Sequence, residues 1–383
     1  MRVQKHPPLP VRVLIAPLDW GLGHATRCIP LIRYFQQKGC SIWIAAEGKV
    51  RSLLLAEFPG LPFLELIGYR IQYSDTGTGL WFKVSIQVPS ILQTIRYERR
   101  WLKKTQEEYH FDVVVSDNRF GLTLPGIHSI YITHQLRIRI PGFPFAEALL
   151  QRLHYHYIRR FSACWVPDAP GIPNLSGVLG HPPQRPSVPV RYLGLLTRFQ
   201  PSDPQNRFHL LVLLSGPEPQ RTLLEARILP DLGDIPGKVC LVRGLPGVAE
   251  VPVVAGNVQV YNHLPSQELN KVICDSTWVV ARSGYSTLMD LVRLGKKAIL
   301  VPTPGQTEQA YLARYAESQG LGVAAEQAGF RLGEALARAE TAVAVRRAPP
   351  GEAGRQAAAL AFQDNFQPVV DELLAALALE RDQ

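Results

Sequence analysis

Residues 279–313 read VVARSGYSTLMDLVRLGKKAILVPTPGQTEQAYLA, and this stretch decides the fold. Val279 to Ala281 can end a buried strand, and the Ser-Gly pair that follows allows a tight turn. A helix is expected next, because small and hydroxylated residues are typical of helix starts. A second apolar strand, Ala298 to Val301, leads into a loop with two prolines and a polar group. The stretch therefore predicts one strand–helix–strand unit of an α/β sheet.

Several polar groups of this unit would meet at the carboxyl edge of the sheet, where open α/β folds bind their ligands. The free amides of a helix start attract anions, so a diphosphate can lie there against Ser283, Gly284, Ser286 and Thr287. Asp290 follows one to two turns into the helix, within reach of the two hydroxyls of a ribose. The simpler alternative is an ordinary capped helix without a ligand.

The order and spacing of RSGYSTLMD, together with the Glu308–Gln309 pair after the next strand, resemble the donor-binding motif of GT-B glycosyltransferases. The similarity is greatest to glycosyltransferase family 28 and to the UDP-glycosyltransferases. It implies a nucleotide-sugar co-substrate, by analogy UDP-linked, and no other cofactor. Glu308 and Gln309 would hold sugar hydroxyls. The implied fold is α/β: two Rossmann-like domains with parallel sheets face a central cleft, and a C-terminal helix crosses back to the first domain.

The rest of the chain is consistent with two such halves. Short apolar strands alternate with helix-length segments from Val11 to Pro167 and again from His209 to Ala325, which predicts parallel sheets covered on both faces. Proline and glycine are frequent around 171–189 and again at 199–205. We therefore expect an N-terminal acceptor domain at 1–198, a hinge at 199–207, a nucleotide-sugar domain at 208–355 and a closing helix at 356–383.

His24 is the candidate catalytic base, because it lies where a glycine turn meets a helix start. The helix dipole disfavours its protonated form, and a neutral imidazole can accept a proton from a hydroxyl. Without the resemblance, a capping or packing role for His24 would be preferred. In many UDP-glycosyltransferases a histidine stands in this loop and an aspartate after a later strand orients it; Asp117 has the corresponding place here. Capping of its own loop is an equal alternative for Asp117.

Other candidates surround this pair. Gly21, Gly23 and Arg27 could contact an acceptor or a phosphate, although an arginine in a first helical turn is commonly just solvated. His134 follows another strand and could reach the acceptor side of the cleft. Its position is the only evidence for that role.

In the second half, Ser215 and Gly216 form another glycine turn whose amides could bind the leaving diphosphate, although neighbouring prolines remove two donors. The resemblance implies main-chain contacts to the base around His263 and Leu264. No DxD pair lies near these residues, so the expected reaction is metal-independent, with helix amides stabilising the leaving group. The resemblance also implies inversion at the anomeric carbon.

Two departures from the family bear on the substrate. The lipid II N-acetylglucosaminyltransferases carry a fuller glycine run in the first loop, glutamate on the donor helix and a glutamine pair after it. This chain has DWGLGH, Asp290 and a Glu-Gln pair, which resembles a hexose-binding arrangement more closely. The sugar and the acceptor stay open, with a glycolipid or cell-envelope precursor as one option. A nucleotide-sugar hydrolase or epimerase, and a non-catalytic nucleotide-sugar-binding protein, are the alternatives.

Composition limits the class of protein and its partners. The 383 residues are 46% hydrophobic and 19% charged, which is typical of a globular protein, and five scattered cysteines suggest packing roles. Met1 to Pro10 lacks the apolar core of a signal peptide, so we expect a cytoplasmic location.

The formal net charge of +9 favours an anionic partner, but no long basic run indicates nucleic acid. The basic cluster from Arg96 to Lys104 lies in an apolar stretch that could rest on an anionic membrane surface. A helix with one buried stripe and one solvated face is the preferred reading, because Glu98, Glu107 and Glu108 dilute the charge.

Overall fold

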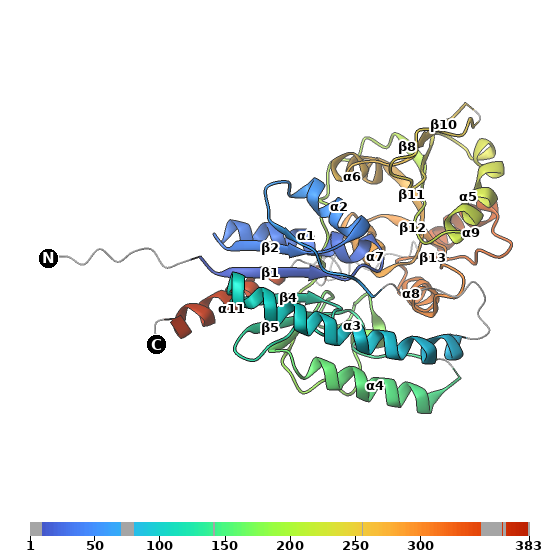
Figure 1. The fold of residues 1–383 in the computed structure, drawn as a ribbon. Helices are drawn as coiled ribbons and strands as arrows, with labels where there is room; N and C mark the ends of the chain where they lie inside the picture. Colours follow the sequence, from blue (N-terminus) through green and yellow to red (C-terminus); the bar gives the residue numbers. More distant parts are fainter. Residues whose placement is uncertain are drawn as a thin grey trace.

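The computed structural model describes residues 10–69, 80–140, 142–254, 256–345, 362 and 365–381, and only the backbone of 80–88 and 343–345. Two parallel β-sheets, each flanked by helices, make up this part of the chain (Figure 1). The predicted α/β class with two Rossmann-like sheets is confirmed.

The first sheet has the strand order β3-β2-β1-β4-β5-β6-β7. Its central strands are short runs of valine, isoleucine and leucine that are buried on both faces, as a sheet covered by helices on both sides requires. The strands are β1 (Arg12–Pro17), β2 (Ser41–Ala45), β3 (Phe63–Leu64), β4 (Val113–Asp117), β5 (His128–Ile132), β6 (Ala163–Val166) and β7 (Val190–Tyr192).

The second sheet has the order β10-β9-β8-β11-β12-β13, with the strand of the opening stretch, β11, next to its centre. Its strands are β8 (Phe208–Leu213), β9 (Val239–Val242), β10 (Val258–Tyr261), β11 (Ser276–Ala281), β12 (Lys297–Leu300) and β13 (Gly322–Ala324). In both sheets the order reverses beside the first strand of the half, β1 or β8. A crevice at the carboxyl ends of the strands forms at such a reversal.

Helices connect the strands of each sheet. Those of the first half are α1 (Leu22–Gln37), α2 (Gly48–Glu57), α3 (Leu80–Tyr109) and α4 (Pro144–Ile158). Those of the second half are α5 (Gln220–Ile228), α6 (Ser266–Cys274), α7 (Tyr285–Arg293), α8 (Thr307–Ser318) and α9 (Leu332–Val345), with short 3₁₀ turns η1 (Gly177–Leu179) and η2 (Leu229–Asp234). Helix α1 packs against α7, so one helix from each half meets the other across the cleft.

The last helix, α11 (Phe366–Arg381), returns to the first half, as predicted. Tyr34 of α1 donates a hydrogen bond to Asp371, at 2.9 Å from Oδ2, and Lys38 pairs with the same carboxylate. Near the other end of α11, Arg381 pairs with Asp112 just before β4. Val370 and Leu377 bury the apolar side of α11 in the main core cluster.

A buried carboxylate organises the loop between β6 and β7. Asp168 accepts hydrogen bonds from the backbone amides of Leu175 and Ser176, both at 2.9 Å, and His181 lies 3.3 Å from it. The folded loop then docks on the second half. The amide of Val178 donates to the hydroxyl of Tyr311 of α8 at 2.9 Å.

Two short strands and one charge differ from the sequence prediction. β3 and β7 were not predicted, because runs of two and three residues give no periodic signal. β7 begins directly after the proline-rich segment 171–189. The last strand of the first sheet ends at Tyr192, and the first strand of the second sheet begins at Phe208. The expected domain limits at 198 and 208 stay predictions.

Helix α3 has one buried stripe, which includes Ile95 and Leu102, as the preferred reading expected. The expectation that Glu98 dilutes the surface charge of this helix is wrong. Glu98 is fully buried and pairs with Arg119 at 3.1 Å.

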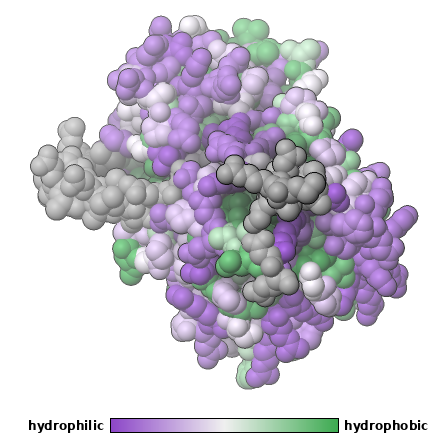
Figure 2. All heavy atoms as spheres, turned by 90° about the vertical axis from the view of Figure 1, so that its left-hand side faces the viewer, coloured by the Kyte–Doolittle hydropathy of each residue, from purple (hydrophilic) through white to green (hydrophobic). Residues whose placement is uncertain are grey.

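The surface that carries α11 is mostly hydrophilic where it is not drawn in grey, with small apolar areas between the charged side chains (Figure 2). None of the helices in the described part of the chain combines the length and hydrophobicity that crossing a bilayer requires.

Candidate active site

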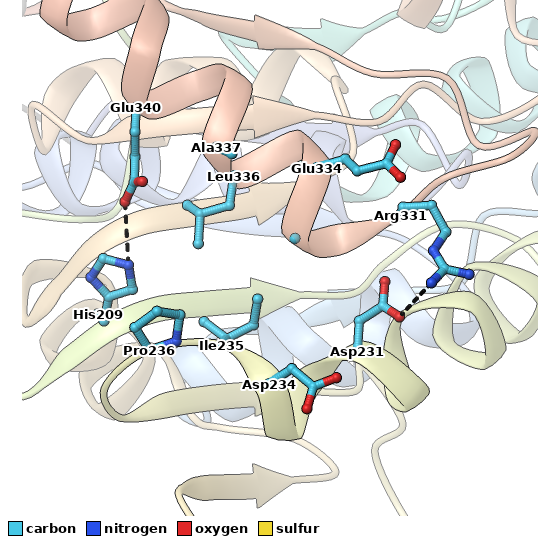
Figure 3. A pocket seen from close by; sticks show the side chains of 11 residues that line it. His209, Asp231, Asp234, Ile235, Pro236, Arg331, Glu334, Leu336, Ala337 and Glu340 are labelled. Atoms are coloured by element: carbon cyan, nitrogen blue, oxygen red, sulfur yellow. Dashed lines mark ion pairs between the residues drawn. The ribbon is translucent and has the colours of Figure 1, made fainter.

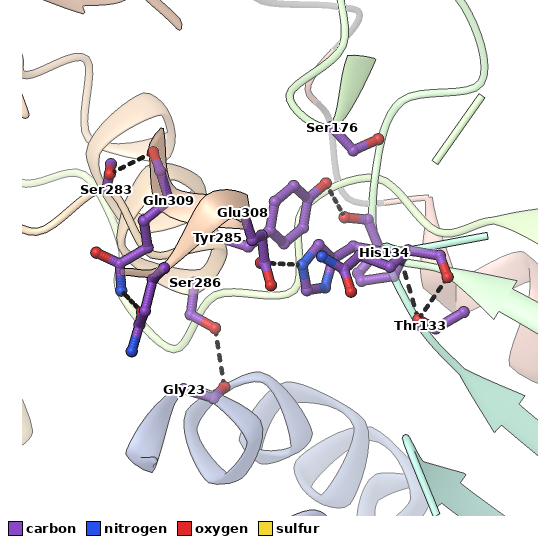
Figure 4. A network of polar contacts seen from close by, with 12 residues as sticks. Gly23, Thr133, His134, Ser176, Ser283, Tyr285, Ser286, Glu308 and Gln309 are labelled. Carbon is purple, nitrogen blue, oxygen red and sulfur yellow. Dashed lines mark hydrogen bonds and ion pairs between the residues drawn. The ribbon is translucent and has the colours of Figure 1, made fainter. Parts of the chain in front are cut away.

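Five of the predicted site residues, from four separate segments, meet in one polar network between the halves. His24 and Arg27 come from the start of α1, Asp117 ends β4, His134 follows β5, and Glu308 lies in the first turn of α8. The carboxyl ends of β4 and β5 and the N-termini of α1 and α8 converge at this point. Figure 4 shows the part of the network around His134 and Glu308.

His24 faces Asp117, as the sequence predicted. The start of α1 at Leu22 follows Gly21, whose φ of 83° is favourable only for glycine, and this turn aims His24 back toward the sheet. His24 Nδ1 lies 3.1 Å from Asp117 Oδ1. Burial lowers the pKa of His24 below its ordinary value, and Arg27 lowers it further against the opposing effect of Asp117. The imidazole is therefore neutral at pH 7.

Arg27 is not solvated, which contradicts that alternative. Its side chain is 1% exposed, and its Nε donates to Asp117 Oδ2 at 2.7 Å while Nη2 pairs with the other carboxylate oxygen. Burial alone would raise the pKa of Asp117, but Arg27 and His24 hold it well below its usual range. Asp117 therefore stays ionised, and both of its carboxylate oxygens are bonded to side chains of α1.

The position of Arg27 also bears on the tautomer of His24. Arg27 Nη2 lies 2.9 Å from His24 Nδ1, the same nitrogen that faces Asp117. One ring nitrogen either accepts from the guanidinium or donates to the carboxylate. Only in the second case does Nε2 keep a free lone pair and act as a base.

His134 links the two halves. Its Nε2 lies 2.7 Å from Glu308 Oε1, and its Nδ1 lies 3.1 Å from Arg27 Nη1. The imidazole stacks on Tyr285, the first residue of α7, with ring centroids 4.1 Å apart and planes 5° from parallel. Burial would raise the pKa of Glu308, but its interaction with His134 lowers it below the ordinary value. Tyr285 was missed by the sequence analysis, because an aromatic residue at a helix start gives no signal of its own.

The predicted donor residues of α7 lie at the boundary between the halves. The hydroxyl of Ser286 donates to the carbonyl of Gly23 at 2.9 Å, and a methyl group on Gly23 would meet that hydroxyl at 2.7 Å. Gly284 is the N-cap residue, and Thr287 lies in the first turn behind it. Ser283 donates to the carbonyl of Gln309 at 2.8 Å, so the two polar loops after β11 and β12 are held together.

Gln309 is used within its own loop. Its Oε1 accepts from the amide of Thr303 at 2.9 Å, and its amide group donates to Gln306. Its neighbour Glu308 points instead toward the first half (Figure 4). The two predicted sugar contacts therefore have different surroundings.

Asp290 lies in the second turn of α7 and contacts the connection between the halves. Thr197 donates to Asp290 Oδ1 at 2.5 Å, and burial raises the pKa of Asp290 to about 6. The sequence analysis missed Thr197, because nothing in its neighbourhood indicates a site. The predicted base loop lies after β10: His263 is exposed and Leu264 is buried.

The glycine turn after β8 leaves Ser215 and Gly216 exposed at the carboxyl end of that strand. Gly216 has a φ of 105°, a conformation that requires glycine. Arg221 and Arg243, which could have served as nearby cations, both pair with the buried Glu225.

A separate cavity of about 360 Å³ lies at the opposite edge of the second sheet, between η2 and α9 (Figure 3). His209, at the beginning of β8, and Asp231 are among its lining residues and pair with Glu340 and Arg331 respectively. None of the predicted site residues lines it.

Two facing parallel sheets with a polar site between them define the GT-B architecture. Residues 252–365 match the model of the glycosyltransferase family 28 C-terminal domain. The chain is thus a glycosyltransferase of the GT-B fold, and its residues 252–365 are similar to the C-terminal domain of family 28. No match among curated proteins reaches significance.

Solved structures share the fold over nearly the whole chain. The glycosyltransferase SnogD from Streptomyces nogalater is 16% identical, with a TM-score of 0.60 and coverage of 96% of this chain and 99% of its own. The spinosyn rhamnosyltransferase SpnG, solved with thymidine diphosphate, is 17% identical, with a TM-score of 0.62 and coverage of 95% and 100%. MurG of Acinetobacter baumannii is 14% identical, with a TM-score of 0.55 and coverage of 96% and 100%.

Proposed function

We propose that this protein is an inverting, metal-independent glycosyltransferase that moves a sugar from a UDP-linked donor to a hydroxyl group of its acceptor. The network that joins His24, Asp117, Arg27, His134 and Glu308 carries the proposal. It brings the neutral imidazole of His24, from the first half, into one network with Glu308 and the start of α8, from the second half. Such an arrangement can activate a hydroxyl and hold a sugar at the same place.

His24 is the proposed base. With its Nδ1 proton donated to Asp117, Nε2 removes the proton of the acceptor hydroxyl as that oxygen attacks the anomeric carbon. The attack comes from the face opposite the diphosphate, so the configuration inverts. Asp117 stays ionised beside Arg27 and stabilises the imidazolium that forms.

The leaving diphosphate is stabilised by the second half. The amides at the start of α7, behind Ser283 and Gly284, and those of the Ser215–Gly216 turn face the carboxyl edge of the sheet. Developing negative charge is favoured there by the helix dipole, without a divalent ion. Asp290 binds the ribose hydroxyls, and Glu308 with its Oε2 accepts from a hydroxyl of the sugar.

The acceptor is proposed to be lipid-linked, and the enzyme to act at the anionic inner surface of the cell membrane. Helix α4 exposes three large apolar side chains at four-residue spacing: Phe145 is 93%, Leu149 67% and Leu153 37% exposed. Residues at this spacing share one face of a helix. Arg152 is exposed on the same helix, Arg159 and Arg160 are exposed directly after its end, and α3 adds its basic cluster next to it. An apolar face with flanking cations suits an anionic lipid surface.

Binding of a nucleotide sugar is the first test. A thermal-shift panel of UDP-, GDP- and dTDP-sugars is expected to raise the melting temperature with the UDP series most strongly, because a ligand of the native state stabilises it. A larger shift with the dTDP series would correct the donor and leave the reaction class standing. No shift with any of them would contradict the proposal.

The base is tested by exchanging His24. His24→Ala is expected to lower kcat by about 10²–10⁴-fold, the range of general base catalysis, with the shift in melting temperature by donor retained. Asp117→Asn is expected to lose activity as well, because the tautomer of His24 is no longer fixed. If the native chain releases free sugar from the donor as fast without an acceptor as with one, the hydrolase alternative is favoured.

A further inference from the structure

The connection between the halves runs from Tyr192 to Phe208, and it places one side chain against the proposed donor site. Thr197 lies in this connection and is 5% exposed. Its hydroxyl donates to Asp290 Oδ1 at 2.5 Å and accepts from the backbone amide of Phe199 at 3.1 Å. A single hydroxyl therefore ties the carboxylate of α7 to the backbone of the connection.

The segment that carries Thr197 is fixed to two helices of the second half. Gln200 and Asn270 of α6 exchange two hydrogen bonds, at 3.1 and 2.9 Å. Arg293 of α7, one turn after Asp290, donates to the side chain of Gln200 at 3.1 Å. The hydroxyl of Thr197 therefore has a fixed place relative to the carboxylate that it contacts.

The hydrogen bond from Thr197 uses only one oxygen of Asp290. In the described part of the chain no donor bonds Oδ2, and the Asp290 side chain is partly exposed. Because Oδ1 is held, the carboxylate cannot rotate without breaking a hydrogen bond to a charged group. Oδ2 is therefore left for a ligand in one fixed orientation.

Two groups of the connection favour the ionised form of Asp290. Burial raises its pKa to about 6, and the hydrogen bond from Thr197 and the charge of Arg198 oppose that rise. Without them the carboxyl group would keep its proton to higher pH, because burial disfavours the charged form.

Arg198 is itself surrounded by charged groups of other elements. It lies 3.8 Å from Glu57 of α2, which also pairs with Arg33 of α1 at 2.9 Å. Burial lowers the pKa of His263, after β10, and Arg198 lowers it further. Arg198 is thus the cation that acts on Asp290, and the carboxylate of Glu57 partly offsets it.

We propose that Thr197 is a positioning residue for the nucleotide-sugar donor: its hydroxyl holds Oδ1 of Asp290 and leaves Oδ2 to the ribose. Recognition of the donor then extends from the second half into the connection. The inference rests on the proposed function, in which Asp290 binds the ribose hydroxyls. A hydroxyl that donates to an ionised carboxylate forms a stronger hydrogen bond than one that donates to a neutral carboxyl group. Without Thr197 the carboxylate rotates or takes up a proton, and either change weakens its contact with the ribose.

The test titrates UDP and dTDP against the full chain by calorimetry, from about pH 5 to about pH 9. Thr197→Val keeps the shape of the side chain and removes the hydroxyl, whereas Thr197→Ser keeps the hydroxyl. Near pH 7 the valine variant is expected to bind the nucleotide about 10-fold more weakly, the effect of one hydrogen bond to a charged group. The serine variant is expected to keep the affinity of the native chain.

The pH dependence separates positioning from a structural role. Affinity is expected to fall as pH drops through the titration of Asp290, and this fall is expected about one pH unit higher in Thr197→Val. The phosphates of the nucleotide titrate at about pH 6 as well, and Asp290→Asn measures their share. A structural role of Thr197 would weaken binding equally at every pH.

Thr123→Val is the matched control for losing a buried hydroxyl. Thr123 is 6% exposed and donates to the carbonyl of Arg160 at 2.8 Å in the first half. Its valine variant is expected to keep the native nucleotide affinity. In turnover, Thr197→Val is expected to raise the KM for the donor and to leave kcat near the native value, because the ribose contact is the same in the ground state and the transition state.

The outcomes separate the role of Thr197 from the proposed function. If the native chain binds neither nucleotide, the proposed function itself is wrong. If it binds one of them, three results would overturn the role of Thr197 and leave the function standing: native affinity in Thr197→Val, an equal loss in Thr197→Ser, or a loss in Thr197→Val that is the same at every pH.

Discussion

His24 shares a single ring nitrogen between a carboxylate and a guanidinium. Nδ1 lies 3.1 Å from Asp117 and 2.9 Å from Arg27. It either carries a proton and donates to Asp117, or has no proton and accepts from Arg27. Arg27 in turn contacts His134, which holds Glu308 from the other half. Glu308 is therefore connected to His24 through three successive contacts.

The lowered pKa of His24 predicts how activity depends on pH. Because the folded pKa lies below 6.5, the imidazole stays neutral as pH falls through that value, and kcat/KM is expected to hold until more acidic pH. The profile is measured from about pH 5 to pH 8 with saturating acceptor, a range that contains the ordinary titration of histidine. An acidic limb centred above 6.5 would contradict the assignment of His24.

Asp290 predicts opposite effects on stability and on binding. Its pKa is raised from 3.8 to about 6, so between these values the unfolded chain loses its proton first and stability falls as pH rises. Asp290→Asn removes the cost of burying an ionised carboxylate at this position. Its melting temperature is expected to exceed that of the native chain at about pH 8 and to match it at about pH 4, on either side of the titration.

The same variant is expected to bind UDP more weakly, because an amide accepts less strongly from ribose hydroxyls than a carboxylate. Differential scanning fluorimetry and calorimetry give the two readouts. Asp234→Asn, at an exposed position away from the site, is the control for the loss of a charge. Unchanged stability at alkaline pH would show that Asp290 is ordinarily hydrated.

Among the elements, the loop between β6 and β7 has the most specific contact with the other half. Gly177 has a φ of 52°, and a methyl group on it would lie 2.2 Å from the hydroxyl of Tyr311. Tyr315 of the same helix donates to Asn174 at 2.9 Å. The loop therefore fits α8 only with glycine at this position.

Gly177→Ala is expected to push the loop away from α8 and to destabilise the chain by about 1–3 kcal/mol, the range for a strained backbone residue. Urea unfolding measures the loss. Gly171→Ala in the same loop is the control, because its methyl group would meet no atom within 4 Å. Equal stability of the two variants would mean that the loop does not depend on its contact with α8.

The strength of the local signal decided which elements could be predicted. The opening stretch was correct because its strands, turn and helix are each marked by residue type, and α7 begins at Tyr285, one residue before the expected start at Ser286. β3 and β7 give no periodic signal, and β7 is a strand through its pairing with β6, which lies more than 20 residues earlier in the chain. Glu98 appeared to be a surface charge because its partner, Arg119, is distant in sequence.

The same reasoning applies to the site. His24, Asp117 and Glu308 stand beside recognisable turns, and the resemblance to GT-B glycosyltransferases implied that they share one cleft. Thr197 was missed because its contact with Asp290 forms only when the two halves assemble.

At the scale of the molecule, the apolar face of α4 predicts membrane binding. The double variant Phe145→Glu and Leu149→Glu is expected to lose co-sedimentation with vesicles of phosphatidylglycerol and phosphatidylcholine, because two exposed apolar contacts become repulsive. The native chain is expected to bind these vesicles and to leave pure phosphatidylcholine unbound.

Leu379→Glu is the matched control, because Leu379 is 66% exposed on α11 and lies away from α4. Its binding to the anionic vesicles is expected to stay at the native level. Equal loss in the control and the double variant would attribute the effect to net charge alone. If the control and the double variant both keep native binding to the vesicles, α4 is not the contact surface.

The return of α11 to the first half closes the molecule on itself. The chain passes from the first sheet to the second after Tyr192, and passes back before Phe366, so two separate strands of backbone join the halves. A single proteolytic cut in the first connection would leave the halves tethered through α11.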